Sequence, residues 1–148
     1  MKQNNAILRA YQHMDLPSLA QRCIELGYTP TIEDMTSRMS EISQQPNSKT
    51  IVAELNGQVV GFMGMLKNLS WESNNYFLRI QALVVSEEYR KIGVGKALID
   101  FAESYAKDIK AKSLVLNCGN RSEREIVHRF YTALGFEAKT IGYRKEIE

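Results

Sequence analysis

The amino-acid sequence predicts an α+β fold, in which helices flank a central mixed β-sheet in the order β-α-α-β-β-β-α-β-α-β. Two strand-like runs flank the dipeptide Asn56-Gly57, which is typical of a tight hairpin turn. Several segments carry apolar residues at three- and four-residue spacing, as amphipathic helices do. A long apolar run at residues 76–85 leads through a glycine-spaced turn into one of these helices.

The N-terminal part is expected to contain a strand at residues 6–11 and two helices. Asp15 is suited to the N-cap of the first helix and Pro17 to its first turn. This helix should stop at Gly27, and its apolar stripe consists of Leu16, Leu19, Cys23 and Leu26. Thr31 and Asp34 resemble a capping box at the start of the second helix, whose apolar face consists of Ile32, Met35, Met39 and Ile42.

The central strands follow. Residues 50–55 and 58–65 should pair as an antiparallel hairpin around Asn56-Gly57. A polar loop at residues 67–75 then leads to the long strand at residues 76–85.

The C-terminal part is expected to alternate helices and strands. Residues 94–109 carry a helical apolar stripe, and residues 112–116 form a short apolar strand. Ser122 and Glu125 can cap a further helix that ends at Gly135, and a final strand is expected from residue 136 to about residue 147.

Composition narrows the class of protein. With 148 residues, 44% of them hydrophobic, we expect a single domain over residues 1–148. A net charge of +2 argues against nucleic acid as a main partner. The N-terminus lacks the apolar core of a signal peptide and no apolar run is long enough to span a membrane, so we expect a cytoplasmic protein with no membrane partner. Two cysteines and two histidines are too few for a metal cage, so we expect no metal and free thiols at Cys23 and Cys118.

The turn at residues 90–96 has the features of an anion-binding site. Gly93 and Gly95 allow a tight turn and a close approach of the backbone to a ligand. The amides at a helix N-terminus are unpaired and carry the positive end of the helix dipole, so a pyrophosphate fits there. Arg90, Lys91 and Lys96 add positive charge. The alternative is that the glycines only make a tight strand-to-helix turn.

Two motifs in the C-terminal half resemble a known family. The turn is not a GxxxxGK[ST] phosphate loop, and it lacks the third glycine and the acidic residue of a dinucleotide-binding unit. Its Arg-x-x-Gly-x-Gly spacing, led by Arg90, resembles the acetyl-CoA pyrophosphate loop of the GNAT family of N-acetyltransferases. Residues 124–136 resemble the family's other signature, a helix ending in Phe130-Tyr131 and followed by Leu-Gly-Phe. The predicted element order is also that of the GNAT fold.

The resemblance implies a transferase that moves an acetyl group from acetyl-CoA to a primary amine of a small molecule. The pantetheine arm of CoA would pair with the backbone of the strand before the turn, like an added half-strand. Asn120 could also bond the pantetheine, or be an ordinary loop or capping residue. The residues expected to bind acetyl-CoA are Leu83, Val85, Arg90, Lys91, Ile92, Gly93, Val94, Gly95, Lys96 and Asn120.

Tyr131 is the expected catalytic residue. In the family, the tyrosine at this position of the motif assists departure of the CoA thiolate, and a phenol can donate the required proton. The transfer would be a direct attack without an acetylated enzyme. The alternative is that Tyr131 is a core aromatic residue. His128 lies one helical turn earlier and either shapes the acceptor site or is an exposed helical histidine.

The general base and the acceptor are left open. Gln81 and Ala82 stand where many family members carry a carboxylate, and neither can act as a base, so Glu54, Glu72 or a water are the candidates. Two-residue alternation would place Arg79 on the face of Gln81, Leu83 and Val85, either toward an anionic acceptor or toward solvent. Acetylation of a protein or peptide amine and a noncatalytic CoA-sensing module are the alternative functions, and a homodimer is left open.

Overall fold

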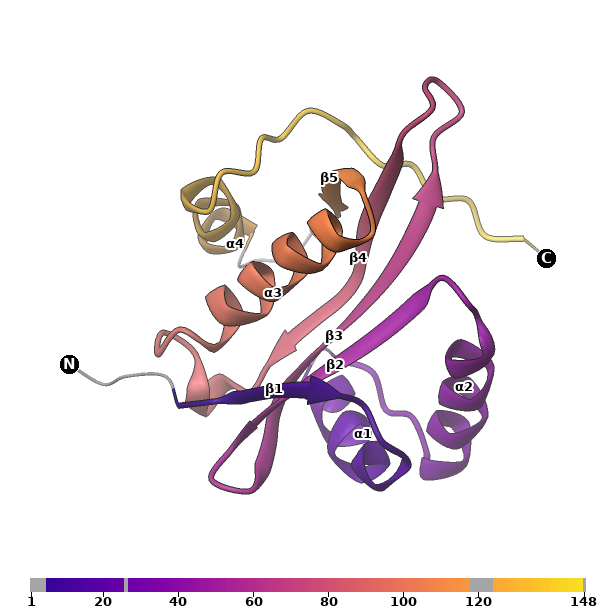
Figure 1. Cartoon of the computed structure of the whole chain (residues 1–148). Helices are drawn as coiled ribbons and strands as arrows, with labels where there is room; N and C mark the ends of the chain where they lie inside the picture. Colours follow the sequence, from indigo (N-terminus) through magenta and orange to yellow (C-terminus); the bar gives the residue numbers. More distant parts are fainter. Residues whose placement is uncertain (1–4, 26, 118–123, 148) are drawn as a thin grey trace. The chain divides into compact units, whose positions relative to one another are not determined.

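The computed structural model describes residues 5–25, 27–117 and 124–147 (Figure 1). The chain divides into two compact units, Met1–Val115 and Leu116–Glu148, and each is described by itself. The strands form one five-stranded sheet in the order β1-β2-β3-β4-β5, with bounds β1 (Ile7–Ala10), β2 (Ser48–Leu55), β3 (Gln58–Leu69), β4 (Tyr76–Val85) and β5 (Ala111–Leu116). The first three pairs of neighbours are antiparallel. The helix α3 (Val94–Asp108) joins β4 to β5, as a crossover between parallel strands does, and the predicted mixed α+β sheet is confirmed.

Two N-terminal helices follow β1. A short 3-10 turn, η1 (His13–Asp15), leads directly into α1 (Leu16–Glu25), and α2 (Ile32–Gln44) comes next. The predicted capping box of α2 is confirmed: the Asp34 amide donates to Thr31 Oγ1 at 3.0 Å, and the Thr31 amide donates to Asp34 Oδ2 at 3.2 Å.

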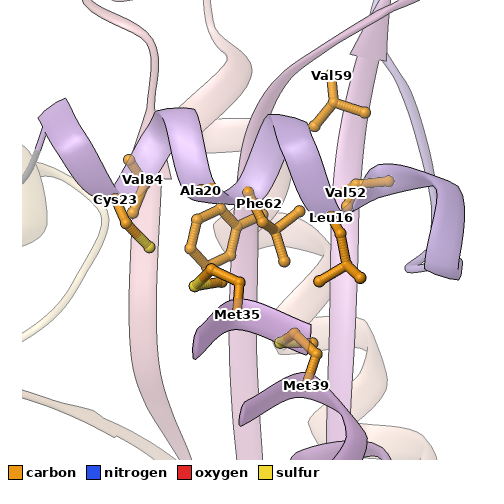
Figure 2. Packing of buried hydrophobic residues seen from close by; sticks show 10 residues of the cluster. Leu16, Ala20, Cys23, Met35, Met39, Val52, Val59, Phe62 and Val84 are labelled. Atoms are coloured by element: carbon orange, nitrogen blue, oxygen red, sulfur yellow. The ribbon is translucent and has the colours of Figure 1, made fainter. Parts of the chain in front are cut away.

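The apolar stripes of α1 and α2 pack on one face of the sheet (Figure 2). The main buried members of this cluster are Leu16, Leu19, Ala20, Cys23, Met35, Met39, Val52, Val59, Phe62 and Val84. Cys23 is a free thiol, as expected, and its burial raises the pKa of the thiol.

The third helix covers the other face of the sheet. Ile51 and Met63 adjoin Val52 and Phe62 in sequence, so they point to the opposite face, where they are equally buried. The helix α3 contacts β2, β3 and β4. Its buried side chains are Val94, Leu98, Ile99, Ala102 and Ala106.

The β2–β3 hairpin has the turn that the sequence predicts. Asn56 and Gly57 both have positive φ, 52° and 79°, as a two-residue turn of type I′ requires. Strand β3 is longer than expected and continues to Leu69, because its last residues still pair with the start of β4. The polar loop is therefore confined to residues 70–75.

The second unit contains the helix α4 (Arg124–Ala133), and Gly135, the predicted stop signal, follows two residues later with a φ of 93°. The prediction of a final strand is wrong, because no described residue from 136 to 147 lies in a strand. A strand needs a neighbour for its backbone groups and a surface for its apolar face. Among the described residues of this unit only Leu116 belongs to a strand, and Ile141, Tyr143 and Ile147 are 80–94% exposed.

Candidate active site

The turn between β4 and α3 is built by two residues with left-handed backbone. After Val85, a short 3-10 turn, η2 (Glu87–Tyr89), leads to Arg90, and α3 begins at Val94. Gly93 is the N-cap of α3 with a φ of 94°, and Lys91 has a φ of 68°. L-residues other than glycine rarely adopt this conformation, so Lys91 is strained. Left-handed residues of this kind form the concave backbone nests that bind anions, which supports the predicted phosphate site.

The start of α3 has the backbone geometry of an anion-binding helix N-terminus. The first intrahelical bond runs from the Ala97 amide to the Gly93 carbonyl at 2.9 Å, so the preceding amides of the first turn point out of the helix. Val94 is buried and anchors the turn, while Gly95 is only half-buried. The backbone therefore offers donors where the dipole of a fifteen-residue helix favours negative charge.

The three cationic side chains around the turn differ in the contacts that they already make. Arg90 is exposed, and its Nε donates to the Val85 carbonyl at 3.1 Å, which leaves its two terminal nitrogens able to meet a phosphate. Lys91 is also exposed. Lys96 pairs with Asp100 one helical turn ahead, Nζ to Oδ2 at 2.9 Å. We therefore expect Arg90 and Lys91 to contribute more charge than Lys96.

The predicted pantetheine edge follows from the register of β4. An added Cβ on Gly61 would lie 2.8 Å from the Val84 carbonyl oxygen, so this carbonyl points toward β3. The Ser86 amide also points there, donating to the Val60 carbonyl at 2.7 Å. Because backbone groups of successive strand residues alternate in direction, those of Leu83 and Val85 point away from β3, toward the side of β4 on which β5 follows in the sheet. These are the two residues that the family resemblance implies as partners of the pantetheine.

A β-bulge in β4 corrects the expected position of Arg79. Gly64 pairs with Ala82 but Met65 pairs with Ile80, which makes Gln81 an extra, exposed residue. One inserted residue reverses the alternation, so Arg79 lies on the face of Ala82 and Val84 rather than that of Leu83 and Val85. The guanidinium of Arg79 lies 5.9 Å from the ring centre of Phe77.

Tyr131 belongs to the second unit, where its ring is held by two aromatic neighbours. Phe130 and Phe136 approach it edge-on, with ring centres at 5.1 and 5.6 Å. The Tyr131 carbonyl accepts from the amides of Leu134 and Phe136, which closes the helix end. The side chain is half-buried, and that of His128 is exposed. Asn120 and Cys118 lie outside the described residues.

The two candidate bases lie in ordinary polar surroundings. Glu54 Oε1 is 3.5 Å from Arg9 Nη2, and its side chain is 29% exposed. Glu72 is exposed in the β3–β4 loop and accepts from Ser70 Oγ at 3.0 Å. Neither contact distinguishes one of them as the base.

The structure also reveals a polar cleft that the sequence did not indicate. It has a volume of about 590 Å³ and is lined by α1, the β2–β3 turn and η2. Ser86 and Glu25 meet in its wall, where Ser86 Oγ donates to Glu25 Oε1 at 3.2 Å. The charged side chains of the lining are Arg9, Asp15, Arg22, Glu25, Glu54 and Glu88.

Residues 5–25, 27–117 and 124–147 contain neither a metal-binding cluster nor a membrane-spanning helix. No group of three or more His, Cys, Asp or Glu side chains there could hold a metal ion. No helix in this part of the chain has the length and apolar character needed to cross a membrane.

Comparison with known proteins agrees with this fold. Over 136 residues the chain is 28% identical to the uncharacterized N-acetyltransferase MJ1530 of Methanocaldococcus jannaschii, covering 91% of this chain and 80% of that protein. It is 34% identical over 93 residues to MJ1207 of the same organism, another uncharacterized N-acetyltransferase, covering 61% of this chain but only 39% of that protein.

Structural similarity extends over nearly the whole chain. The crystal structure of a GNAT family acetyltransferase from Staphylococcus aureus superposes with a TM-score of 0.82 at 27% identity and covers 96% of this chain and 98% of its own. The model of the acetyltransferase (GNAT) family matches residues 16–136, which include both the turn and Tyr131. The chain therefore belongs to the GNAT family of acetyltransferases.

Proposed function

We propose that this protein transfers an acetyl group from acetyl-CoA to a primary amine of a small molecule, and that residues 1–148 act as one acetyltransferase domain. The observation that carries the proposal is the turn at residues 90–96, where left-handed Lys91 and Gly93 open the helix α3 beside the exposed Arg90. The match of the family model over residues 16–136 supports the single domain.

Acetyl-CoA would be bound mainly by backbone groups of the end of β4 and of the turn that follows it. The amides of residues 91–96 and the terminal nitrogens of Arg90 would bind the pyrophosphate. The outward backbone groups of Leu83 and Val85 would pair with the pantetheine. Because Val85 already accepts from Arg90 Nε, the pantetheine amide would share or replace this bond. Acetyl-CoA supplies an activated thioester, and the chain supplies its binding and orientation.

The transfer requires three proton movements. The amine must reach the site neutral, so its ammonium form first gives a proton to a water or to a carboxylate. The amine nitrogen then bonds to the acetyl carbon while the carbon–sulfur bond breaks and its electron pair goes to sulfur. Tyr131 donates a proton to the departing thiolate and regains one from the acetylated nitrogen through water. The edge-on contacts with Phe130 and Phe136 fix the ring that carries this hydroxyl.

A thiol-release assay tests the proposal. The protein is incubated with acetyl-CoA and a panel of amino acid derivatives, polyamines, amino sugars and peptides, and the products are identified by mass spectrometry. We expect CoA release that depends on a small amine and yields its acetylated form. Turnover on peptides alone would indicate a protein or peptide acceptor. CoA binding without turnover on any amine would indicate a sensing module instead.

A further inference from the structure

Ser86 occupies the junction between β4 and the predicted CoA-binding turn. The residue is 4% exposed, and Asp15 is the other buried polar or charged residue among those described. Its amide donates to Val60, its carbonyl accepts from the Tyr89 amide at 2.9 Å, and its hydroxyl donates to Glu25. The last bond joins residues 61 positions apart in sequence.

Glu25 lies at the C-terminal end of α1, a position where the helix itself destabilises a carboxylate. It is the last residue of α1, where the negative end of the helix dipole repels a carboxylate. Two contacts compensate: Ser86 Oγ at Oε1, and Arg22 Nε at 3.8 Å from Oε2. Arg22 Nε is buried and has no hydrogen-bond partner among the described residues, so Glu25 also supplies a counter-charge for this group.

Hydrogen bonds and the short backbone of η2 connect Glu25 to Arg90. The Ser86 carbonyl accepts a hydrogen bond from the Tyr89 amide, and this bond closes the 3-10 turn η2. The Arg90 amide then donates to the Glu87 carbonyl at 3.3 Å, and Arg90 Nε returns to Val85. The helix α1 is itself fixed to the sheet by its buried stripe. The start of the turn is thus tied to the apolar core and not only to its neighbours in sequence.

We propose that Ser86 and Glu25 are positioning residues for acetyl-CoA binding: they act through η2 and Arg90 and do not contact the ligand. This inference rests on the proposed function, because it assumes that residues 90–96 bind CoA. Without the hydroxyl–carboxylate bond, η2 and Arg90 would sample more positions, and CoA would have to order them upon binding.

The test compares Ser86→Ala, Glu25→Ala and Glu25→Gln with the matched control Glu41→Ala, which removes an exposed glutamate of α2. Loss of one hydrogen bond of ordinary strength changes an equilibrium constant by about fivefold. We expect both alanine variants near the turn to raise the Kd of CoA and the KM of acetyl-CoA by about this factor, with kcat nearly unchanged. Glu25→Gln keeps an oxygen that accepts from Ser86, so it should bind CoA as the wild type does.

Hydrogen exchange of the CoA-free proteins separates positioning from general stability. In Ser86→Ala and Glu25→Ala, amides of residues 87–97 should exchange faster while those of α2 stay unchanged. If Ser86→Ala does not fold, Glu25→Ala at the partly exposed end of α1 carries the test. Wild-type CoA affinity and exchange in a folded Glu25→Ala would overturn the positioning role alone. A wild-type protein that does not bind CoA would overturn the proposed function, and this inference with it.

Discussion

Arg9 and Asp15 form a two-point ion pair, in which Nη1 donates to Oδ2 and Nη2 to Oδ1, both at 2.8 Å. The pair ties β1 to the 3-10 turn that precedes α1. The carboxylate also accepts from the Gln12 amide at 2.8 Å. The hydrogen bond from Arg9, followed by that from Gln12, holds the pKa of Asp15 below its ordinary value of 3.8, although burial acts in the opposite direction.

We predict that Asp15→Asn lowers the free energy of unfolding at pH 7 by about 2 kcal/mol, less than for a fully buried pair because Arg9 is 25% exposed. A group with a lowered folded-state pKa stabilises the fold above its ordinary pKa and loses this effect as pH falls through the lowered value. The difference between wild type and variant should therefore shrink below pH 3.8.

Urea unfolding from pH 7 into the acid range measures this difference. Asp108→Asn, at an exposed position of α3, serves as the control and should change stability by less than about 0.5 kcal/mol. A difference for Asp15→Asn that stays constant at acid pH would contradict the assignment of the lowered pKa to this pair.

Lys91 offers a test in which stability and binding change in opposite directions. Because its φ is 68°, Lys91→Gly should relieve strain and raise the free energy of unfolding by about 0.5 kcal/mol. The same change removes a cation, so CoA should bind several times more weakly. Lys91→Ala loses the charge but keeps the strain, so it should weaken binding without the gain in stability. Thermal unfolding and CoA titration of both variants decide this, and CoA affinities equal to the wild type would remove Lys91 from the site.

Tyr131→Phe tests the proposed acid. The change keeps the ring and its contacts with Phe130 and Phe136 but deletes the hydroxyl, so the affinity for acetyl-CoA should change little. Turnover should fall by roughly 10²–10⁴-fold, the range for loss of a positioned acid. Steady-state kinetics measures both quantities.

Cys118→Ala is the companion to that variant, since Cys118 is the thiol that could form an acetylated enzyme. It should retain most of the activity under direct attack. Near-wild-type turnover of Tyr131→Phe, or an acetyl adduct on Cys118 together with an inactive but folded Cys118→Ala, would refute the mechanism.

Features set by local sequence were predictable. The Asn56-Gly57 turn, the Thr31–Asp34 capping box and the bounds of β4 depend on neighbouring residues, and the structure has all three. Glycine also permits the left-handed conformation of Gly93 in the tight turn that the sequence predicts before α3. Of these features, β4 and Gly93 also build the phosphate end of the candidate site.

Features set by tertiary contacts were not predictable. The bulge at Gln81 reverses the faces of β4, and nothing in the alternation of side chains around it marks the inserted residue. The bond between Ser86 and Glu25 joins distant segments, each of which reads as an ordinary polar position. The expected strand at residues 136–147 has the residue types of a strand, but pairing also requires a neighbour that sequence patterns do not identify.

Variants of Gly93 and Gly95 distinguish the effect of the turn's backbone geometry on CoA binding from the effect of side-chain bulk at the ligand. Gly93→Val should reduce both stability and CoA affinity, because valine is strained at a φ of 94°. Gly95 is the second residue of α3, so Gly95→Val should leave stability within about 1 kcal/mol and act mainly through side-chain bulk at the ligand.

Calorimetric titration of CoA into wild type and folded Gly95→Val tests the central claim, that the turn at residues 90–96 binds the cosubstrate. We predict saturable binding to the wild type and an affinity at least about tenfold weaker in the variant, a loss of about 1.4 kcal/mol. Equal CoA affinity in the two proteins would contradict the claim.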